Sequence, residues 1–195
     1  VCNHPSNFLK DSLELGQRSG KVERLREMLF EMIENGESCL IFSQYTEMGA
    51  LLHHNFKKEF ASAQFFFFHG ALSRKKRDDL VKEFSAQNEK PKIMILSLKA
   101  GGTGLNLTQA SNVIHFDRWW NPAAEKQATD RAFRIGQNKN VFVYKFITLG
   151  TIEERIESIL YKKQGLFDSV IGSGEAVLTS LNGVKLRELF ELRET

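Results

Sequence analysis

Two arginines in the second half of the chain have the type and spacing of a phosphate-binding pair. Arg131 and Arg134 follow Gln127 in the run QATDRAFR. In a helix, a spacing of three residues places both guanidinium groups on one face. Guanidinium groups are planar and always charged, so two of them aimed at one place suit a polyphosphate whose charge grows in a transition state. The alternative is a solvated helix face, which is the commoner role of two such arginines.

A glycine-bearing loop precedes these arginines in the sequence. It follows the apolar run Ile93-Met-Ile-Leu96, which is typical of a buried strand, and it reads SLKAGGTGLNL. Glycines let backbone N–H groups approach a ligand that side chains would otherwise block. In parallel sheets, loops at the carboxyl ends of strands are common ligand sites. The loop and the arginines together predict phosphate chemistry.

Three motifs carry a resemblance to a known family. The spacing Q-x-x-x-R-x-x-R-x-G-Q from Gln127 to Gln137 resembles the last motif of superfamily 2 helicase-like ATPases, in the form found in Swi/Snf-type DNA translocases. Asp117 to Pro122 resembles that family's D-x-x-W-N-P element, and residues 96–107 resemble its L-S-x-x-A-G-G-x-G-L-N-L loop. The three motifs occur in the family's order.

The resemblance implies the C-terminal RecA-like lobe of a motor with two lobes. Such a lobe is a three-layer α/β sandwich, in which helices cover both faces of a mainly parallel sheet. The resemblance places Arg131 and Arg134 at ATP as arginine fingers and gives Gln127 a role in orienting them or the attacking water. It also implies that Gly102, Gly104 and Asn106 border the nucleotide.

ATP and Mg²⁺ are expected to be held mainly by an N-terminal RecA-like lobe of the same protein, because this chain lacks two motifs. It contains no GxxxxGK[ST] run and no Asp-Glu box, which supply the phosphate cradle and the magnesium-holding carboxylate. The isolated chain is therefore expected to be a monomer that does not turn over ATP. The full-length protein is expected to be a DNA-dependent ATPase.

Double-stranded DNA is the second partner that the resemblance implies. Hydroxyls, amides and backbone N–H groups at strand ends can bind phosphates without reading bases. The candidates follow the predicted strands, and Trp120 is a further candidate whose alternatives are a core anchor or a contact with the other lobe. The set predicted to bind DNA is Ser43, Gln44, Gly70, Ser97, Lys99 and Trp120.

Two other functions remain open at this stage. The chain could be a RecA-like binding module without ATPase function, although both arginines are intact. It could also be an RNA helicase lobe, which the D-x-x-W-N-P element and Gln127 disfavour, since DEAD-box enzymes resemble one another in carrying His at that position.

Composition and charge are consistent with a globular protein in a reducing compartment. The 195 residues carry a net charge of +3, which permits a polyanionic partner without demonstrating one. Cys2 and Cys39 form neither a disulfide framework nor a CxxC site, and the five histidines lack ligand spacing, so no metal site is expected. No apolar run is long enough to span a membrane. The protein is expected inside the cell, in the cytoplasm or nucleoid of a bacterium or the nucleus of a eukaryote.

The predicted organisation has three parts. Residues 1–20 are an inter-lobe connecting segment, residues 21–150 are the RecA-like lobe, and residues 151–195 are a helical C-terminal extension that packs on this lobe or on the missing one. The chain starts with Val1, which suggests a fragment of something longer. Hydrophobic periodicity and capping residues predict strands at 38–42, 64–68, 93–96, 113–116 and 141–147, and helices at 21–35, 46–60, from Ser73, through the arginine run, from Thr151, and at 184–192.

Overall fold

Five parallel strands form one sheet in the part of the chain that the structure describes. This computed structural model describes residues 2–11, 13–87, 89–98, 100, 105–134 and 136–167, with side chains to residue 160. The strands are β1 (Cys39–Ser43), β2 (Gln64–Phe68), β3 (Lys92–Ser97), β4 (Asn112–His115) and β5 (Phe142–Lys145). Their order is β2-β3-β1-β4-β5, and each neighbouring pair is parallel.

The order of the strands creates a crevice between β1 and β4. After β1 the chain leads to β2 at one edge of the sheet, and after β4 it leads to β5 at the other edge. Loops that leave two adjacent strands in opposite directions diverge, and ligands of open parallel sheets bind in the crevice that results. The register pairs Ser43 with Ser97 on one side of β1 and Phe42 with His115 on the other.

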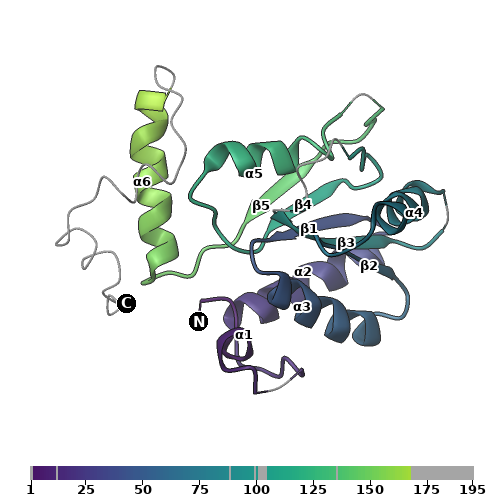
Figure 1. Cartoon of the computed structure of the whole chain (residues 1–195), viewed down its shortest axis with the longest axis horizontal. Coiled ribbons are helices and arrows are strands. Elements are labelled where there is room, and N and C mark those ends of the chain that lie inside the picture. Colours follow the sequence, from purple (N-terminus) through teal and green to yellow (C-terminus); the bar gives the residue numbers. More distant parts are fainter. Residues whose placement is uncertain are drawn as a thin grey trace.

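Helices cover both faces of the sheet, as Figure 1 shows. One face packs against α2 (Gly20–Glu34) and α3 (Thr46–Glu59), and the opposite face packs against α4 (Arg74–Ser85) and α5 (Pro122–Thr129). Two further helices, α1 (Pro5–Leu9) and α6 (Ile152–Phe167), flank these layers near the ends of the described chain. The arrangement is a RecA-like three-layer sandwich, as the sequence predicted.

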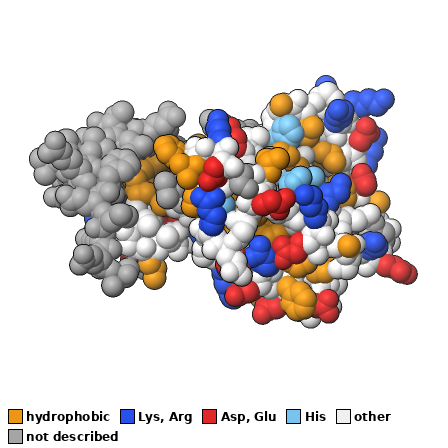
Figure 2. Space-filling model, turned by 90° about the horizontal axis from the view of Figure 1, so that it is seen from below, with side chains coloured by type: hydrophobic (Ala, Val, Ile, Leu, Met, Phe, Trp, Pro, Cys, Tyr) orange, Lys and Arg blue, Asp and Glu red, His pale blue; other side chains and the backbone are white. Residues whose placement is uncertain are grey.

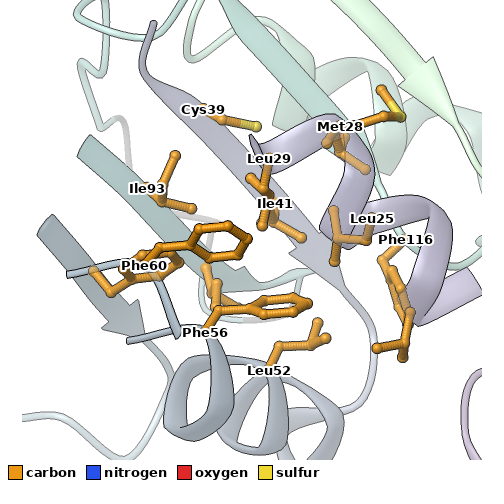
Figure 3. Close-up of a cluster of buried hydrophobic side chains, with 14 of the residues drawn as sticks. Leu25, Met28, Leu29, Cys39, Ile41, Leu52, Phe56, Phe60, Ile93 and Phe116 are labelled. Carbon is orange, nitrogen blue, oxygen red and sulfur yellow. The ribbon is translucent and has the colours of Figure 1, made fainter. Parts of the chain in front are cut away.

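The core between the sheet and α2 and α3 is built from alternating strand residues. Ile41 of β1 and Ile93 of β3 point to the same side as Leu25 and Leu29 of α2 and Phe56 of α3 (Figure 3). All of these side chains are fully buried. Burying a side chain of this size stabilises a fold by about 1.5 to 3 kcal/mol. The second core, under α4 and α5, uses the intervening residues of the same strands.

Most predicted elements are confirmed to within one or two residues. Ser19 caps α2 by accepting a hydrogen bond from the N–H of Val22, and Ser73 caps α4 through the N–H of Lys76. Gly36, which follows α2, has a φ of +70° that suits glycine and ends the helix. Thr46, at the start of the predicted helix 46–60, has the residue type of an N-cap but is the first helical residue, and the N-cap is Tyr45, which makes no side-chain cap.

The predicted helix through the arginine run is wrong at its C-terminal end. α5 ends at Thr129, and residues 130–134 form turns. Arg131 and Arg134 therefore do not leave one helix face together. Beyond the end of the helix, the carbonyl of Arg131 accepts a hydrogen bond from the N–H of Leu107, which lies far away in the sequence.

The surface formed over α2 and α3 intermixes charges of both signs. Figure 2 shows lysines and arginines interspersed with acidic side chains on this face, which is typical of a solvated surface rather than of a patch for a polyanion. None of the described helices is long and apolar enough to cross a membrane. The predicted helix at 184–192 lies outside the described residues.

Candidate nucleotide and DNA site

The two candidate arginines occupy different environments in one turn. Arg131 is only 4% exposed, whereas Arg134 is exposed at the surface. Burial lowers the pKa of Arg131 below its usual value, and the neighbouring charge of Arg134 lowers it further. The two cations are thus close enough to influence each other. Two cations held near each other suit a polyanion that would offset their mutual repulsion.

The arginine turn, residues 130–134, is fixed by contacts with the segment that precedes β4. The backbone hydrogen bond from Leu107 N to Arg131 O is 3.1 Å long, and it brings the exposed Asn106 next to this turn. Asn106 and Arg131, which were predicted to lie at the same nucleotide, are therefore neighbours. Gln127 is exposed on α5, two residues before the helix ends.

Gln137 holds this turn in place, a role that the sequence did not reveal. Its side-chain amide donates to the carbonyls of Thr108, Ala110 and Ala132, at 3.0, 2.9 and 3.3 Å. The amide thus joins the arginine turn to the segment before β4. The motif spacing identified Gln137 as part of a pattern, but only the fold shows what its side chain contacts.

Asp117 organises the crevice between β1 and β4. It follows β4 and is buried, and its two carboxylate oxygens accept three hydrogen bonds. The donors are the hydroxyl of Ser43 at 2.6 Å, the N–H of Gln44 at 2.8 Å and the side-chain amide of Asn3 at 3.0 Å. Burial raises the pKa of Asp117 to about 6, although these hydrogen bonds oppose the shift.

A buried ion pair lies beside this carboxylate. The ammonium of Lys21 is 2.5 Å from the carboxylate of Glu153, and both side chains are buried. Lys21 also donates to the carbonyl of Phe116 at 3.0 Å and to the side-chain oxygen of Asn3 at 3.2 Å. This pair therefore joins α2, the end of β4, the leading segment and the start of α6.

A second buried cation ties α5 to α6. Arg118 donates from Nε to Glu125 of α5 at 3.1 Å and pairs through Nη1 with Glu157 of α6. Glu125 also accepts the N–H of Trp119 at 3.0 Å. Glu153 and Glu157 are four residues apart, so they share one face of α6. On that face, Glu153 pairs with the buried Lys21 and Glu157 pairs with the buried Arg118.

Two of the predicted DNA-binding residues line one hollow at the strand ends. Gln44 and Trp120 border a space of about 620 Å³, together with the exposed rings of Phe8 and Tyr45. The side-chain amide of Gln44 donates to the carbonyl of Arg118 at 3.2 Å. The hollow opens where the chain leaves β1 and β4, so the structure brings these two candidates together.

The remaining DNA candidates lie along the same sheet ends. Ser97 is buried at the end of β3, beside Ser43 in the register. Gly70 is exposed after β2, and its carbonyl accepts a hydrogen bond from Arg77 at 2.5 Å. Three predicted site residues, Lys99, Gly102 and Gly104, lie outside the described residues.

A neutral histidine supports the end of α5. His115 is buried at the end of β4, stacks on Phe42 at 5.5 Å between ring centroids, and lies 2.9 Å from the hydroxyl of Thr129. Burial lowers the pKa of His115 to about 4. Thr129 is the last residue of α5, so His115 helps to fix the point where the arginine turn begins.

Comparisons with known proteins agree with this fold. The family model described as the helicase conserved C-terminal domain matches residues 20–136, so the chain carries a helicase C-terminal domain. The chain is 49% identical over 197 residues to a putative ATP-dependent helicase/translocase, YwqA, of Bacillus subtilis, and 40% identical over 189 residues to an uncharacterized ATP-dependent helicase of Mycoplasma pneumoniae. These alignments cover 100% and 96% of this chain, but 21% and 18% of the relatives.

Similar solved structures identify the family within the helicases more closely. The SWI2/SNF2 ATPase core of Sulfolobus solfataricus, in complex with dsDNA, is 40% identical with a TM-score of 0.83, covering 99% of this chain and 40% of that chain. The C-terminal domain of the Sulfolobus enzyme is 38% identical with a TM-score of 0.79, covering 99% and 77%. The chain belongs to the Swi2/Snf2 family of superfamily 2 helicase-like proteins. It corresponds to the C-terminal RecA-like lobe of these proteins. It spans about a fifth of the length of the curated relatives.

Proposed function

We propose that this chain is the second motor lobe of an ATP-dependent translocase that moves along double-stranded DNA. In the proposal, an N-terminal RecA-like lobe of the same protein holds most of the ATP, and this lobe completes the site across a cleft. Membership of the Swi2/Snf2 family supports the proposal, as does the likeness to an ATPase core solved with dsDNA. ATP closes the two lobes on each other, and hydrolysis releases them, so alternate closure moves the protein along its track.

The arginine turn is the observation that supports a catalytic role for this lobe. Its backbone is fixed by Gln137 and Leu107, while Arg134 is exposed at the surface. An arginine finger must be exposed, because it reaches a nucleotide held by another lobe. A fixed backbone also helps, because less conformational freedom is then lost when the side chain meets the nucleotide. Arg131, which is buried beside it, adds a second positive charge, and Gln127 orients the pair or the attacking water.

Magnesium chemistry has no ligand set in the described part of this lobe. The described residues include no group of three His, Cys, Asp or Glu side chains that could hold a metal ion. In the proposal, the other lobe binds Mg²⁺ together with ATP, and this lobe contributes charge through its arginines.

The test is Arg134→Ala in the full-length protein. DNA-stimulated ATP turnover should fall by about 10³-fold or more, because an arginine finger contributes that much to the rate. ATP binding, measured with a fluorescent nucleotide, should change little. Arg24→Ala is the matched control, since Arg24 is an exposed arginine of α2 with a local partner, Glu27. Normal turnover in Arg134→Ala would show that this residue is not the finger.

A further inference from the structure

We propose that Asp117 is the positioning residue that shapes the loop formed by the last residue of β1 and the two that follow it, residues 43–45, for contact with the DNA backbone. The inference rests on the proposed function and deepens it. It separates the predicted DNA residues into those that can touch a phosphate and those that hold the loop in place.

One carboxylate holds two successive residues of this loop. One oxygen of Asp117 accepts the N–H of Gln44, and the other accepts the hydroxyl of Ser43. Hydrogen bonds to an ionised acceptor are roughly twice as strong as those between neutral groups. A loop held at two adjacent positions by a buried anion has little freedom to change its backbone conformation.

The hydroxyl of Ser43 is committed inside the protein. Its single proton can go to Asp117 at 2.6 Å or to the carbonyl of Tyr45 at 3.4 Å, and the short contact with the carboxylate is the stronger one. The same oxygen accepts the N–H of Tyr45 at 3.2 Å. Ser43 is also buried. Its effect on DNA binding is therefore indirect and passes through Asp117.

A third hydrogen bond to Asp117, from Asn3, connects the loop to the chain segment before the lobe. The side-chain amide of Asn3 donates to Asp117, while the oxygen of the same amide accepts from Lys21. Asn3 thus bridges the carboxylate to the buried Lys21–Glu153 pair. The conformation of the loop depends on the position of residue 3 as well as on the sheet.

The direct readout of this arrangement is the amide proton of Gln44. In NMR spectra of the chain, this amide should be protected from exchange, and its shift should titrate with a midpoint near the pKa of Asp117, about 6. In Asp117→Asn the titration should disappear, and protection should fall. An unprotected Gln44 amide in the wild-type chain, or the same titration in Asp117→Asn, would overturn the proposal.

DNA affinity provides the functional readout, with Glu47→Gln as the matched control. Glu47 is exposed in the first turn of α3 and lines the same hollow as Gln44. Both substitutions remove one negative charge near the proposed DNA contact, so simple electrostatics predicts tighter binding for both. Positioning predicts the opposite for Asp117→Asn, namely a loss of about threefold to tenfold in affinity for a duplex. Tighter binding by Asp117→Asn would refute the positioning role.

A double-mutant cycle tests whether Ser43 acts through Asp117. Ser43→Ala should weaken duplex binding alone, and the double variant should bind no more weakly than Asp117→Asn. Additive losses would instead make Ser43 an independent DNA ligand and contradict the proposal.

Failure of the proposed function gives a different result from failure of this inference. If the wild-type chain shows no salt-dependent binding of duplex DNA, the proposed DNA role fails, while the Gln44 amide still reports whether Asp117 orders the loop. If wild-type binding is salt-dependent but Asp117→Asn binds equally well, only the inference fails.

Discussion

The buried pair formed by Lys21 and Glu153 should dominate the stability of the junction between the lobe and α6. The substitution Glu153→Gln keeps the size of the side chain and removes its charge. Lys21 then remains buried with two neutral acceptors, the carbonyl of Phe116 and the side chain of Asn3. The amide must also replace the carboxylate as acceptor for the N–H of Thr148, which now lies 2.9 Å away.

The expected cost follows from the loss of the direct ion-pair partner of Lys21. Removing one partner of a buried ion pair costs about 3 to 5 kcal/mol, and the two remaining acceptors place this case near 3 kcal/mol. Urea denaturation followed by circular dichroism measures the free energy of unfolding, and the slope should stay unchanged if only the folded state is weakened.

A neighbouring carboxylate is the matched control. Glu154 is exposed and accepts the N–H of Gly150 at 3.0 Å, so Glu154→Gln should cost less than about 1 kcal/mol. The double variant Lys21→Met with Glu153→Gln should recover most of the loss, because no charge of this pair is left buried and the amide can still accept the N–H of Thr148. Equal stabilities for Glu153→Gln and Glu154→Gln would refute the reasoning.

Two further predictions concern stability. Between about pH 4 and pH 6, the raised pKa of Asp117 makes stability fall as the pH rises, whereas the lowered pKa of His115 makes stability rise, so the two effects oppose each other. Each effect changes the free energy of unfolding by about 3 kcal/mol. In urea titrations at several pH values, the free energy of unfolding should therefore fall with pH in His115→Gln and rise with pH in Asp117→Asn. An unchanged pH dependence in both variants would contradict the assignments. In α3, Gly49→Val should lower the free energy of unfolding by at least about 2 kcal/mol, because a Cβ there would lie 2.7 Å from the ring of Phe67. Ala50→Val, on the exposed neighbour, should cost less than about 1 kcal/mol in the same assay.

Local patterns were sufficient to predict the layers of this fold. The strands are short apolar runs, and α2 and α4 begin after serines that cap them, so these elements carry their own signals in the sequence. The leading segment was the exception, since α1 has only five residues and no periodicity that could reveal it. Its one local signal is Pro5 directly after His4, which acts as the N-cap.

The site was harder to predict, because long-range contacts decide it. A hydrogen bond from Leu107 and the amide of Gln137 hold the turn that follows α5, and both depend on a segment that precedes β4. Asp117 matched a family motif, but its role needs partners at residues 3, 43 and 44 that only the fold assembles. Sequence spacing can therefore find the candidates without showing which of them act directly.

The strand order also has a consequence for synthesis of the chain on the ribosome. β1 and β2 emerge first, yet they are not neighbours, because β3 lies between them. No strand of the sheet can pair until residues 92–97 have left the ribosome, and β4 and β5 follow later still. Until then the run of four phenylalanines in β2 has no partner strand, and exposed apolar segments of this kind are prone to aggregate. Early protection of this nascent strand by α3, which packs beside it, would shorten the period of risk.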